Sequence, residues 1–312
     1  MHTAPMFVFY LKKIILFLMS VVTLFTAPCA GKWADSYAGH EFPLISAETQ
    51  QPDTLRILSF NIRCTDVNGV SPDDRKGVVV RQILEIMPDS FGIQEATNSW
   101  MRTLNKHLAL LYDWVGIDRD KGGSPLAKDA GESCPVFYLK AKFKLLDSGN
   151  FWLSETPDEP SFGPGAACRR ICTWAKLEDR STGDVFVHVN THFDHVSEQA
   201  RVEGAKIVNS FIAEHFADVP VVFTADLNTA EKGAAYGAMT QTLSNAQTLA
   251  GDAVSFGTFH ACKPETHAGY TIDFVLCSAQ FTADAYRTVT VGVDGRFVSD
   301  HFPIYADLRF VR

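Results

Sequence analysis

Ser299-Asp300-His301-Phe302-Pro303, near the C-terminus, is the stretch from which the fold of this 312-residue chain is inferred most directly. It places a carboxylic acid beside an imidazole, immediately before an apolar run typical of a strand. By itself the pair could equally be a polar loop. Its significance comes from four earlier segments, in which polar residues again border apolar runs. These segments are Ser59-Phe60-Asn61-Ile62-Arg63, Gln94-Glu95, Asn190-Thr191-His192-Phe193-Asp194 and Ala225-Asp226-Leu227-Asn228.

Apolar periodicity predicts that these segments lie at strand ends. Leu55 to Phe60 and Val219 to Ala225 have the short, β-branched composition of buried strands. Helical spacing of apolar residues predicts helices over 77–87 and 196–216. Since strands occur both in hairpins and in alternation with helices, we expect an α/β fold. Two sheets packed face to face, with helices outside, fit this order best.

The N-terminus has the layout of a secretory signal. Lys12 and Lys13 precede an apolar run from Ile14 to Ala27, and small residues follow it. The run is shorter than the roughly 20 residues that a membrane-spanning helix needs, so we expect a cleaved leader over residues 1–30 and no stable membrane span. A lipoprotein acylated at Cys29 is the alternative, although its flanking residues fit that signal poorly.

After the leader, residues 31–53 are mixed in composition and predict a linker or lead-in, which leaves 54–312 as one domain. We expect the protein to be exported to the periplasm or the extracellular space, and to be a monomer. Six of the seven cysteines then remain. An even number permits disulfides in an exported protein. No Cys-x-x-Cys pair is present, so a zinc site is not predicted; free thiols, with one bridge left open, are expected.

The chain is acidic, with 28 Lys and Arg against 36 Asp and Glu. The leader contains two of the lysines, so the mature net charge is 28 − 2 − 36 = −10. Tight binding to duplex nucleic acid usually requires a dense basic face, because neutralised phosphates release counterions. Composition therefore disfavours a stable nucleic-acid complex, but it does not exclude an enzyme that cleaves nucleic acid.

The polar residues at the strand ends have the chemistry of a metal-assisted phosphoryl site. Mg²⁺ prefers carboxylate and amide oxygens, which Glu95, Asn61 and Asp300 could supply. His192, Asn228 and an arginine could donate to the developing charge on phosphorus, and a histidine such as His301 could orient water. Each residue also has an ordinary explanation: Asn61 could lie in a turn, Asp226 could cap a helix, and His192 could be a core histidine. Coincidence at all these strand ends is improbable.

At these residues the chain resembles the endonuclease/exonuclease/phosphatase superfamily. The resemblance runs from about Leu55 to Arg312. The motifs that carry it are Phe60-Asn61-Ile62-Arg63, Gln94-Glu95, Thr191-His192-Phe193-Asp194, Asp226-Leu227-Asn228, Ile272-Asp273-Phe274 and Ser299-Asp300-His301. It implies a four-layer α/β sandwich, in which two packed mixed β-sheets are flanked by helices. It also implies Mg²⁺-dependent cleavage of a phosphate ester, with Mn²⁺ as the alternative cation.

The resemblance also implies a role for individual residues. Glu95, Asn61 and Asp300 correspond to the metal ligands. The catalytic residues are expected to be His192, Asp226, Asn228, Asp273 and His301, in which Asp273 orients His301. Arg170, Asn190 and Tyr138 are expected to bind the substrate phosphate.

We therefore expect an exported phosphoesterase that hydrolyses a phosphate mono- or diester of a small molecule by metal-assisted attack of water. The alternatives are a secreted nuclease acting on DNA or RNA and a catalytically silent binding module. Specificity is expected in loops, including 118–132, whose Gly, Lys and Asp residues and lack of apolar periodicity predict an exposed loop.

Overall fold

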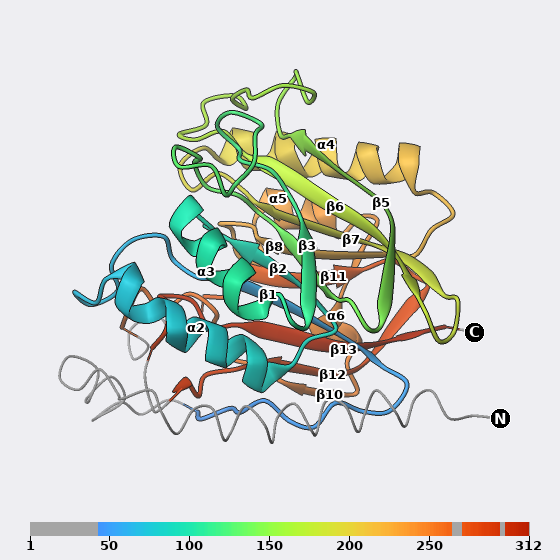
Figure 1. The fold of residues 1–312 in the computed structure, drawn as a ribbon. Coiled ribbons are helices and arrows are strands. Elements are labelled where there is room, and N and C mark those ends of the chain that lie inside the picture. Colours follow the sequence, from blue (N-terminus) through green and yellow to red (C-terminus); the bar gives the residue numbers. More distant parts are fainter. Residues whose placement is uncertain (1–42, 264–269, 294–296, 312) are drawn as a thin grey trace.

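A computed structural model describes residues 43–263, 270–293 and 297–311. The expected leader (1–30), Cys29 and the first part of the lead-in lie outside the described residues. The described chain forms two mixed β-sheets stacked face to face, with helices on both outer sides (Figure 1). This is the four-layer α/β sandwich that the resemblance implies.

The seven-stranded sheet contains, in spatial order, β10 (Asp252–Val254), β12 (Phe281–Thr288), β13 (Ile304–Phe310), β1 (Leu55–Asn61), β2 (Ser90–Gln94), β4 (Val136–Leu139) and β3 (Tyr112–Val115). The six-stranded sheet contains β5 (Phe143–Trp152), β6 (Ile171–Asp179), β7 (Val185–His192), β8 (Val221–Asp226), β11 (Asp273–Cys277) and β9 (Ser244–Asn245). The helices are α2 (Pro72–Ile86), α3 (Asn98–Leu108), α4 (Glu198–His215), α5 (Ala234–Met239) and α6 (Ala246–Leu249).

Each sheet combines parallel and antiparallel pairs. β1 is parallel to β2 and antiparallel to β13. In the other sheet β8 is parallel to β7 and antiparallel to β11. The carboxyl ends of β1, β2, β7 and β8 therefore lie at one edge of the sandwich, together with the start of β11.

Two hydrophobic cores hold the layers together. In the first, α2 and α3 pack on the outer face of the seven-stranded sheet, and the inner faces of the two sheets contact each other through side chains such as Ile57 and Val275. In the second, α4 and α5 cover the outer face of the six-stranded sheet through residues such as Val208 and Phe223 (Figure 1). Burial of both sheets explains why the central strands are almost continuously apolar.

Helix α2 begins earlier than its apolar periodicity predicted. The Ser71 hydroxyl accepts a hydrogen bond from the Asp74 amide, and Pro72 occupies the first turn, where no hydrogen-bond donor is needed. Met87, with φ of 49°, ends the helix in a left-handed conformation. The extra N-terminal turn contains Arg75, which is completely buried.

The segment 118–132 is only partly the exposed loop that its composition predicted. The Asp118 carboxylate is buried and accepts hydrogen bonds from the amides of Asp120 and Gly131, both at 2.9 Å. Arg119 forms an ion pair with Glu132 at 2.8 Å, and only 8% of Arg119 is exposed. The segment folds back on itself because its polar side chains bond to each other and to its own backbone.

The described part of the lead-in, residues 43–53, contains no helix or strand, and hydrogen bonds attach it to the domain. The Ile45 amide donates to the Thr290 hydroxyl at 2.7 Å, and Glu48 pairs with Arg287 at 2.8 Å. Within the described residues, no helix is long and apolar enough to cross a membrane. The six described cysteines are free thiols, three of them buried.

Candidate active site

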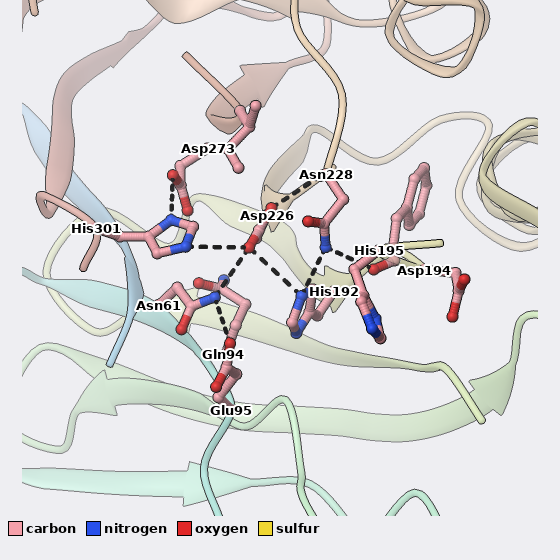
Figure 2. A network of polar contacts seen from close by, with 12 residues as sticks. Asn61, Gln94, Glu95, His192, Asp194, His195, Asp226, Asn228, Asp273 and His301 are labelled. Carbon is pink, nitrogen blue, oxygen red and sulfur yellow. Dashed lines mark hydrogen bonds and ion pairs between the residues drawn. The ribbon is translucent and has the colours of Figure 1, made fainter. Parts of the chain in front are cut away.

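Strand register brings the predicted site residues together. In the first sheet, Asn61 at the end of β1 is paired with Gln94 at the end of β2, which places Glu95 next to Asn61. In the second, Asp226 at the end of β8 is flanked by His192 of β7 and Asp273 of β11. The two rows face each other across the sandwich, and the segment before β13 adds His301 (Figure 2). Asp300, in the same segment, lies 4.0 Å from His301 Nε2.

Asn61 links the two sheets. Its Nδ2 donates to Glu95 Oε1 at 3.1 Å and to Asp226 Oδ2 at 2.9 Å, and its Oδ1 accepts from the Arg63 amide at 3.0 Å (Figure 2). The Cys64 amide donates to Glu95 Oε2 at 2.8 Å. Burial would raise the pKa of Glu95, but these donors outweigh it and lower the pKa, so this carboxyl stays ionised.

Asp226 is the centre of the network. Its Oδ2 also lies 3.4 Å from His192 Nε2 and 3.8 Å from His301 Nε2, and its Oδ1 accepts from the Asn228 amide at 2.8 Å. Burial and the nearby charge of Asp273 raise the pKa of Asp226, although His301 and the hydrogen bonds oppose this rise. Such a carboxyl can accept a proton at neutral pH.

His301 is held by a carboxylate, as the resemblance implied. Its Nδ1 lies 2.8 Å from Asp273 Oδ2, and its Nε2 faces Asp226. Burial lowers the pKa of His301, but the carboxylates of Asp273, Asp226 and Asp300 outweigh burial and raise it. Asp226 and His301 therefore titrate as a pair.

His192 has a defined tautomer. Asn228 Nδ2 donates one hydrogen to the Phe193 carbonyl and the other to His192 Nε2, both at 2.9 Å, so Nε2 accepts and Nδ1 carries the proton. Burial, with the positive charges of Arg170 and Arg119, lowers the pKa of His192 well below its ordinary value. Among the described residues, its buried Nδ1 has no hydrogen-bond partner.

Arg170 lies beside the histidines. Its Nη2 is 3.0 Å from His195 Nδ1 and its Nε is 3.5 Å from Asp194 Oδ2, while only 5% of the residue is exposed. Asp194 in turn accepts from the amides of Ser197 and Ala167, which fixes the loop on either side. Within the described chain, Arg170 Nη1 is buried and has no hydrogen-bond partner. It is therefore an unused donor beside the histidines.

The residues predicted to bind a metal have an oxygen-rich donor set. The guanidinium of Arg63 already spans the two carboxylates, with Nη1 3.9 Å from Glu95 and Nε 3.5 Å from Asp300. Carboxylate and amide oxygens that attract a cation between them suit Mg²⁺ or Mn²⁺. The chemistry of Glu95 and Asp300 suits a divalent ion. Asn61, the third expected ligand, directs its Nδ2 towards Glu95 and Asp226 and its Oδ1 towards the Arg63 amide, so in this structure it positions Glu95.

Sequence reasoning assigned no role to three residues that lie at this site. Arg63 was visible in the Phe-Asn-Ile-Arg motif and carries φ of 56°, a left-handed conformation that turns the chain towards Glu95. Glu132 lies close to Cys64 and Glu95, and Arg119 is close enough to lower the pKa of His192. Glu132 and Arg119 belong to the segment predicted to be exposed, so no periodic signal marked them.

Two predicted phosphate-binding residues lie elsewhere. Asn190 is buried between the sheets, where its Nδ2 donates to the carbonyls of Ile93 and Pro135 and its Oδ1 accepts from Gln94 at 2.8 Å. Tyr138 lies in β4, opposite Ser90 and Asp113, and burial raises the pKa of its hydroxyl to about 12. The structure does not join either side chain to the network around Asp226.

Several solved structures resemble the whole described domain. A crystal structure of an endonuclease/exonuclease/phosphatase from Bacteroides vulgatus is 34% identical, with a TM-score of 0.76; the match covers 83% of this chain and 99% of that chain. A mannosyl-6-phosphatase from Bacteroides thetaiotaomicron is 30% identical with a TM-score of 0.76, and the match covers 82% of this chain and 100% of that chain.

A second protein of that organism, described as an endonuclease/exonuclease/phosphatase family protein, is 29% identical with a TM-score of 0.75, and the match covers 84% of this chain and 100% of that chain. No family model matches the sequence. A search of the curated proteins also found no match.

Proposed function

The chain belongs to the endonuclease/exonuclease/phosphatase family, and we propose that it hydrolyses a phosphate ester with the help of Mg²⁺ or Mn²⁺. One observation carries this proposal: residues from β1, β2, β7, β8, β11 and the segment before β13 form a single buried polar network at one edge of the sandwich (Figure 2). The chemistry of those residues matches the needs of phosphoryl transfer to water.

Glu95 and Asp300 would hold the cation, with Asn61 fixing the position of Glu95. When bound, the cation supplies positive charge that neutralises the phosphate and the charge developing on it. Arg63, now between the two carboxylates, would turn towards the phosphate or solvent, since 39% of its side chain is exposed. The position of one positive group between two carboxylates supports a cation at this place.

The Asp226–His301 pair would activate water. Asp273 holds His301 through Nδ1, which leaves Nε2 facing Asp226. Water attacks phosphorus, its proton passes to the Asp226–His301 pair, and the bond from phosphorus to the ester oxygen breaks. The departing alkoxide takes a proton from solvent and leaves as the alcohol. General-base assistance of this kind contributes about 10²- to 10⁴-fold to a rate.

His192 and Arg170 would stabilise the negative charge of the transition state. His192 Nδ1 carries a proton that no described residue accepts, and Asn228 keeps the imidazole in that tautomer. Arg170 contributes its Nη1. Both donors are buried and fixed before substrate arrives, which is the arrangement that makes electrostatic stabilisation effective.

We propose that the substrate is a small phosphomonoester, such as a phosphorylated sugar. The solved relative from Bacteroides thetaiotaomicron is a mannosyl-6-phosphatase, which supports this substrate class. The net charge of −8 for the whole chain also favours a small substrate over a polyanion. A secreted nuclease remains the alternative that experiment must separate from it.

An activity panel tests the proposal. Purified protein is incubated with Mg²⁺ or with EDTA, and with mannose 6-phosphate, glucose 6-phosphate, inositol phosphates, bis-p-nitrophenyl phosphate, plasmid DNA and RNA. We expect Mg²⁺-dependent release of phosphate from at least one sugar phosphate and no cleavage of nucleic acid. Cleavage of DNA or RNA without release from any monoester would replace the phosphatase proposal with the nuclease.

We also propose that the protein is exported. The basic pair Lys12-Lys13 and the apolar run that follows support a cleaved leader. N-terminal sequencing of the protein recovered from its native host tests this. A mature chain that still begins at Met1 in the cytoplasm would contradict export without affecting the proposed chemistry.

A further inference from the structure

We propose that Arg75 of α2 is a positioning residue that fixes, at the same time, the loop after β1, whose amides bind Asn61 and Glu95, and the segment that carries Asp300 and His301. This inference rests on the proposed function, because it concerns the same site. Arg75 touches neither Glu95 nor His301 in a hydrogen bond. It acts through the backbone of the loop that donates to Glu95 and of the segment that carries His301.

The guanidinium of Arg75 binds four backbone carbonyls. Its Nη1 donates to Ile62 at 2.9 Å and to Val298 at 2.7 Å. Its Nη2 donates to Arg63 at 2.7 Å and to Thr65 at 2.6 Å. Three of these carbonyls belong to the loop after β1 and the fourth to the segment before β13, so one side chain joins two segments that are distant in sequence.

The loop after β1 organises the metal side of the site. Its carbonyls at 62, 63 and 65 are directed towards Arg75, and its amides then face the other way. The Arg63 amide donates to Asn61 Oδ1 at 3.0 Å, and the Cys64 amide donates to Glu95 Oε2 at 2.8 Å. The left-handed φ of 56° at Arg63 is part of this turn. Without Arg75, the converging carbonyls of this loop would repel one another.

The segment before β13 organises the base side. Directly after Val298, the Ser299 hydroxyl donates to the Asn61 carbonyl at 2.7 Å, and Asp300 and His301 follow. Arg75 therefore fixes the start of this segment, and Ser299 joins it to the end of β1. The separation between Glu95 and Asp300 depends on both connections.

An arginine is the side chain suited to this position. A planar guanidinium has five N–H donors in a rigid fork and can satisfy four carbonyls, whereas an ammonium has three donors at one point. Arg75 is 0% exposed, and burial lowers its pKa to about 10. None of its hydrogen bonds goes to a carboxylate, and burying a charge in this way is costly. The cost is understandable if the loops must hold Glu95 and Asp300 at a fixed separation.

The test replaces Arg75 by lysine, which keeps the charge but not the fork. Isothermal titration with Mn²⁺ in the absence of substrate measures cation affinity directly. We expect Arg75→Lys to bind Mn²⁺ about 10- to 100-fold more weakly, as is usual when a partner behind a metal ligand is removed. The kcat at a fixed, limiting Mg²⁺ concentration should fall, while KM for the phosphate ester should change little.

Arg81→Lys is the matched control, because Arg81 lies on the same helix and pairs with Glu85 at 3.7 Å on its more exposed side. It should bind Mn²⁺ like the wild type. Hydrogen exchange adds a second readout: in Arg75→Lys, and not in Arg81→Lys, residues 62–65 and 297–301 should lose protection together, even without metal.

The inference would be overturned if the Arg75→Lys variant folds, binds Mn²⁺ with wild-type affinity and keeps both segments protected from exchange. If Arg75→Lys does not fold, Trp100→Phe replaces it, since the guanidinium lies 5.3 Å from the Trp100 ring and the smaller ring supports it less. Unchanged Mn²⁺ affinity and unchanged hydrogen exchange in Trp100→Phe would then mean that Arg75 contributes to folding and does not position the site. If the wild type binds no Mn²⁺, the proposed function fails instead, and hydrogen exchange still decides whether Arg75 holds the two loops.

Discussion

Two polar clusters lie between the same pair of sheets, and they differ in charge: one gathers carboxylates and the other is neutral. The catalytic cluster comprises Asn61, Glu95, His192, Asp226, Asn228, Asp273, Asp300 and His301. The inter-sheet cluster comprises Ser90, Gln94, His188, Asn190 and Thr224, all of them completely buried. The catalytic cluster contains four carboxylates and leaves His192 Nδ1 and Asp273 Oδ1 without a partner among the described residues. The inter-sheet cluster contains no carboxylate, and its Gln94 Oε1 is without a partner among the described residues.

The inter-sheet cluster is a nearly closed set of neutral donors and acceptors. Ser90 donates to the Phe137 carbonyl at 2.8 Å, so His188 Nδ1 must donate to Ser90 Oγ at 2.7 Å. Thr224 Oγ1 then lies 2.9 Å from the accepting His188 Nε2. Burial of a polar side chain is therefore not a sufficient sign of function. Unused donors and crowded like charges are the better sign, because a fold that served stability alone would remove them.

The largest expected effect separates activity from stability in the catalytic cluster. Asp226→Asn removes the proton acceptor, so phosphate release should fall by about a thousandfold or more. The melting temperature should change little, because the loss of one accepted hydrogen bond opposes the removal of a charge that burial and Asp273 disfavour. Initial rates and thermal melts test this against the exposed control Asp218→Asn. Activity close to the wild type would remove Asp226 from the mechanism.

The opposite outcome is expected for Asn190 in the inter-sheet cluster. Asn190→Leu removes the donor to the carbonyls of Ile93 and Pro135 and the acceptor for one hydrogen of the Gln94 amide, which should lower the free energy of unfolding by about 3 to 4 kcal/mol. The rate per folded molecule should stay near that of the wild type. Urea unfolding measures the change in stability, and Asn209→Leu on α4 is the control. A large loss of activity at unchanged stability would instead support the phosphate-binding role expected from the sequence.

The sequence predicted most of the fold and most of the catalytic cluster for one reason. Residues such as Glu95 and Asp226 follow strongly apolar strands, so their position at strand ends could be read locally. Asn190 lies two residues before His192 in β7, so both side chains point to the same face of the sheet. Only the structure shows that Asn190 packs against Gly92 and Thr224 rather than joining the network around Asp226. Arg75 bonds to the carbonyls of irregular loops, and Glu132 lies in an irregular segment, so neither contact leaves a periodic signal in the sequence.

Gly92 tests how closely the sheets must approach at the inter-sheet cluster. A Cβ at this position would lie 2.2 Å from Thr224 Oγ1 and 2.3 Å from Asn190 Oδ1. Gly92→Ala should therefore lower the free energy of unfolding by about 1 to 3 kcal/mol through overpacking. Gly77→Ala is the matched control, because a Cβ there has nothing within 4 Å and alanine favours the helix. Equal stability of the two variants would show that the sheets can separate without cost.

The smallest effect is a pH dependence that comes from His188. Burial lowers the pKa of His188 from its ordinary 6.5 to about 3. Between these pH values the histidine is protonated in the unfolded chain and neutral in the folded chain. Stability must therefore fall as pH drops below about 6.5 and continue to fall to about 3. Between pH 7.5 and 5.5 the loss should be about 1.4 kcal/mol. His188→Gln should remove this part of the slope in urea unfolding. A wild-type slope equal to that of the variant would contradict the assignment.

The Mg²⁺ dependence of phosphate release, compared between the wild type and Glu95→Gln, tests the central claim that the catalytic cluster is a metal-dependent phosphoesterase site. The wild type should show saturable activation by Mg²⁺, no activity in EDTA and full recovery when Mg²⁺ is restored. Glu95→Gln should need at least about tenfold more Mg²⁺ and reach a lower maximal rate. Phosphate release that is insensitive to EDTA, or a Glu95→Gln variant with the wild-type Mg²⁺ requirement, would contradict the claim.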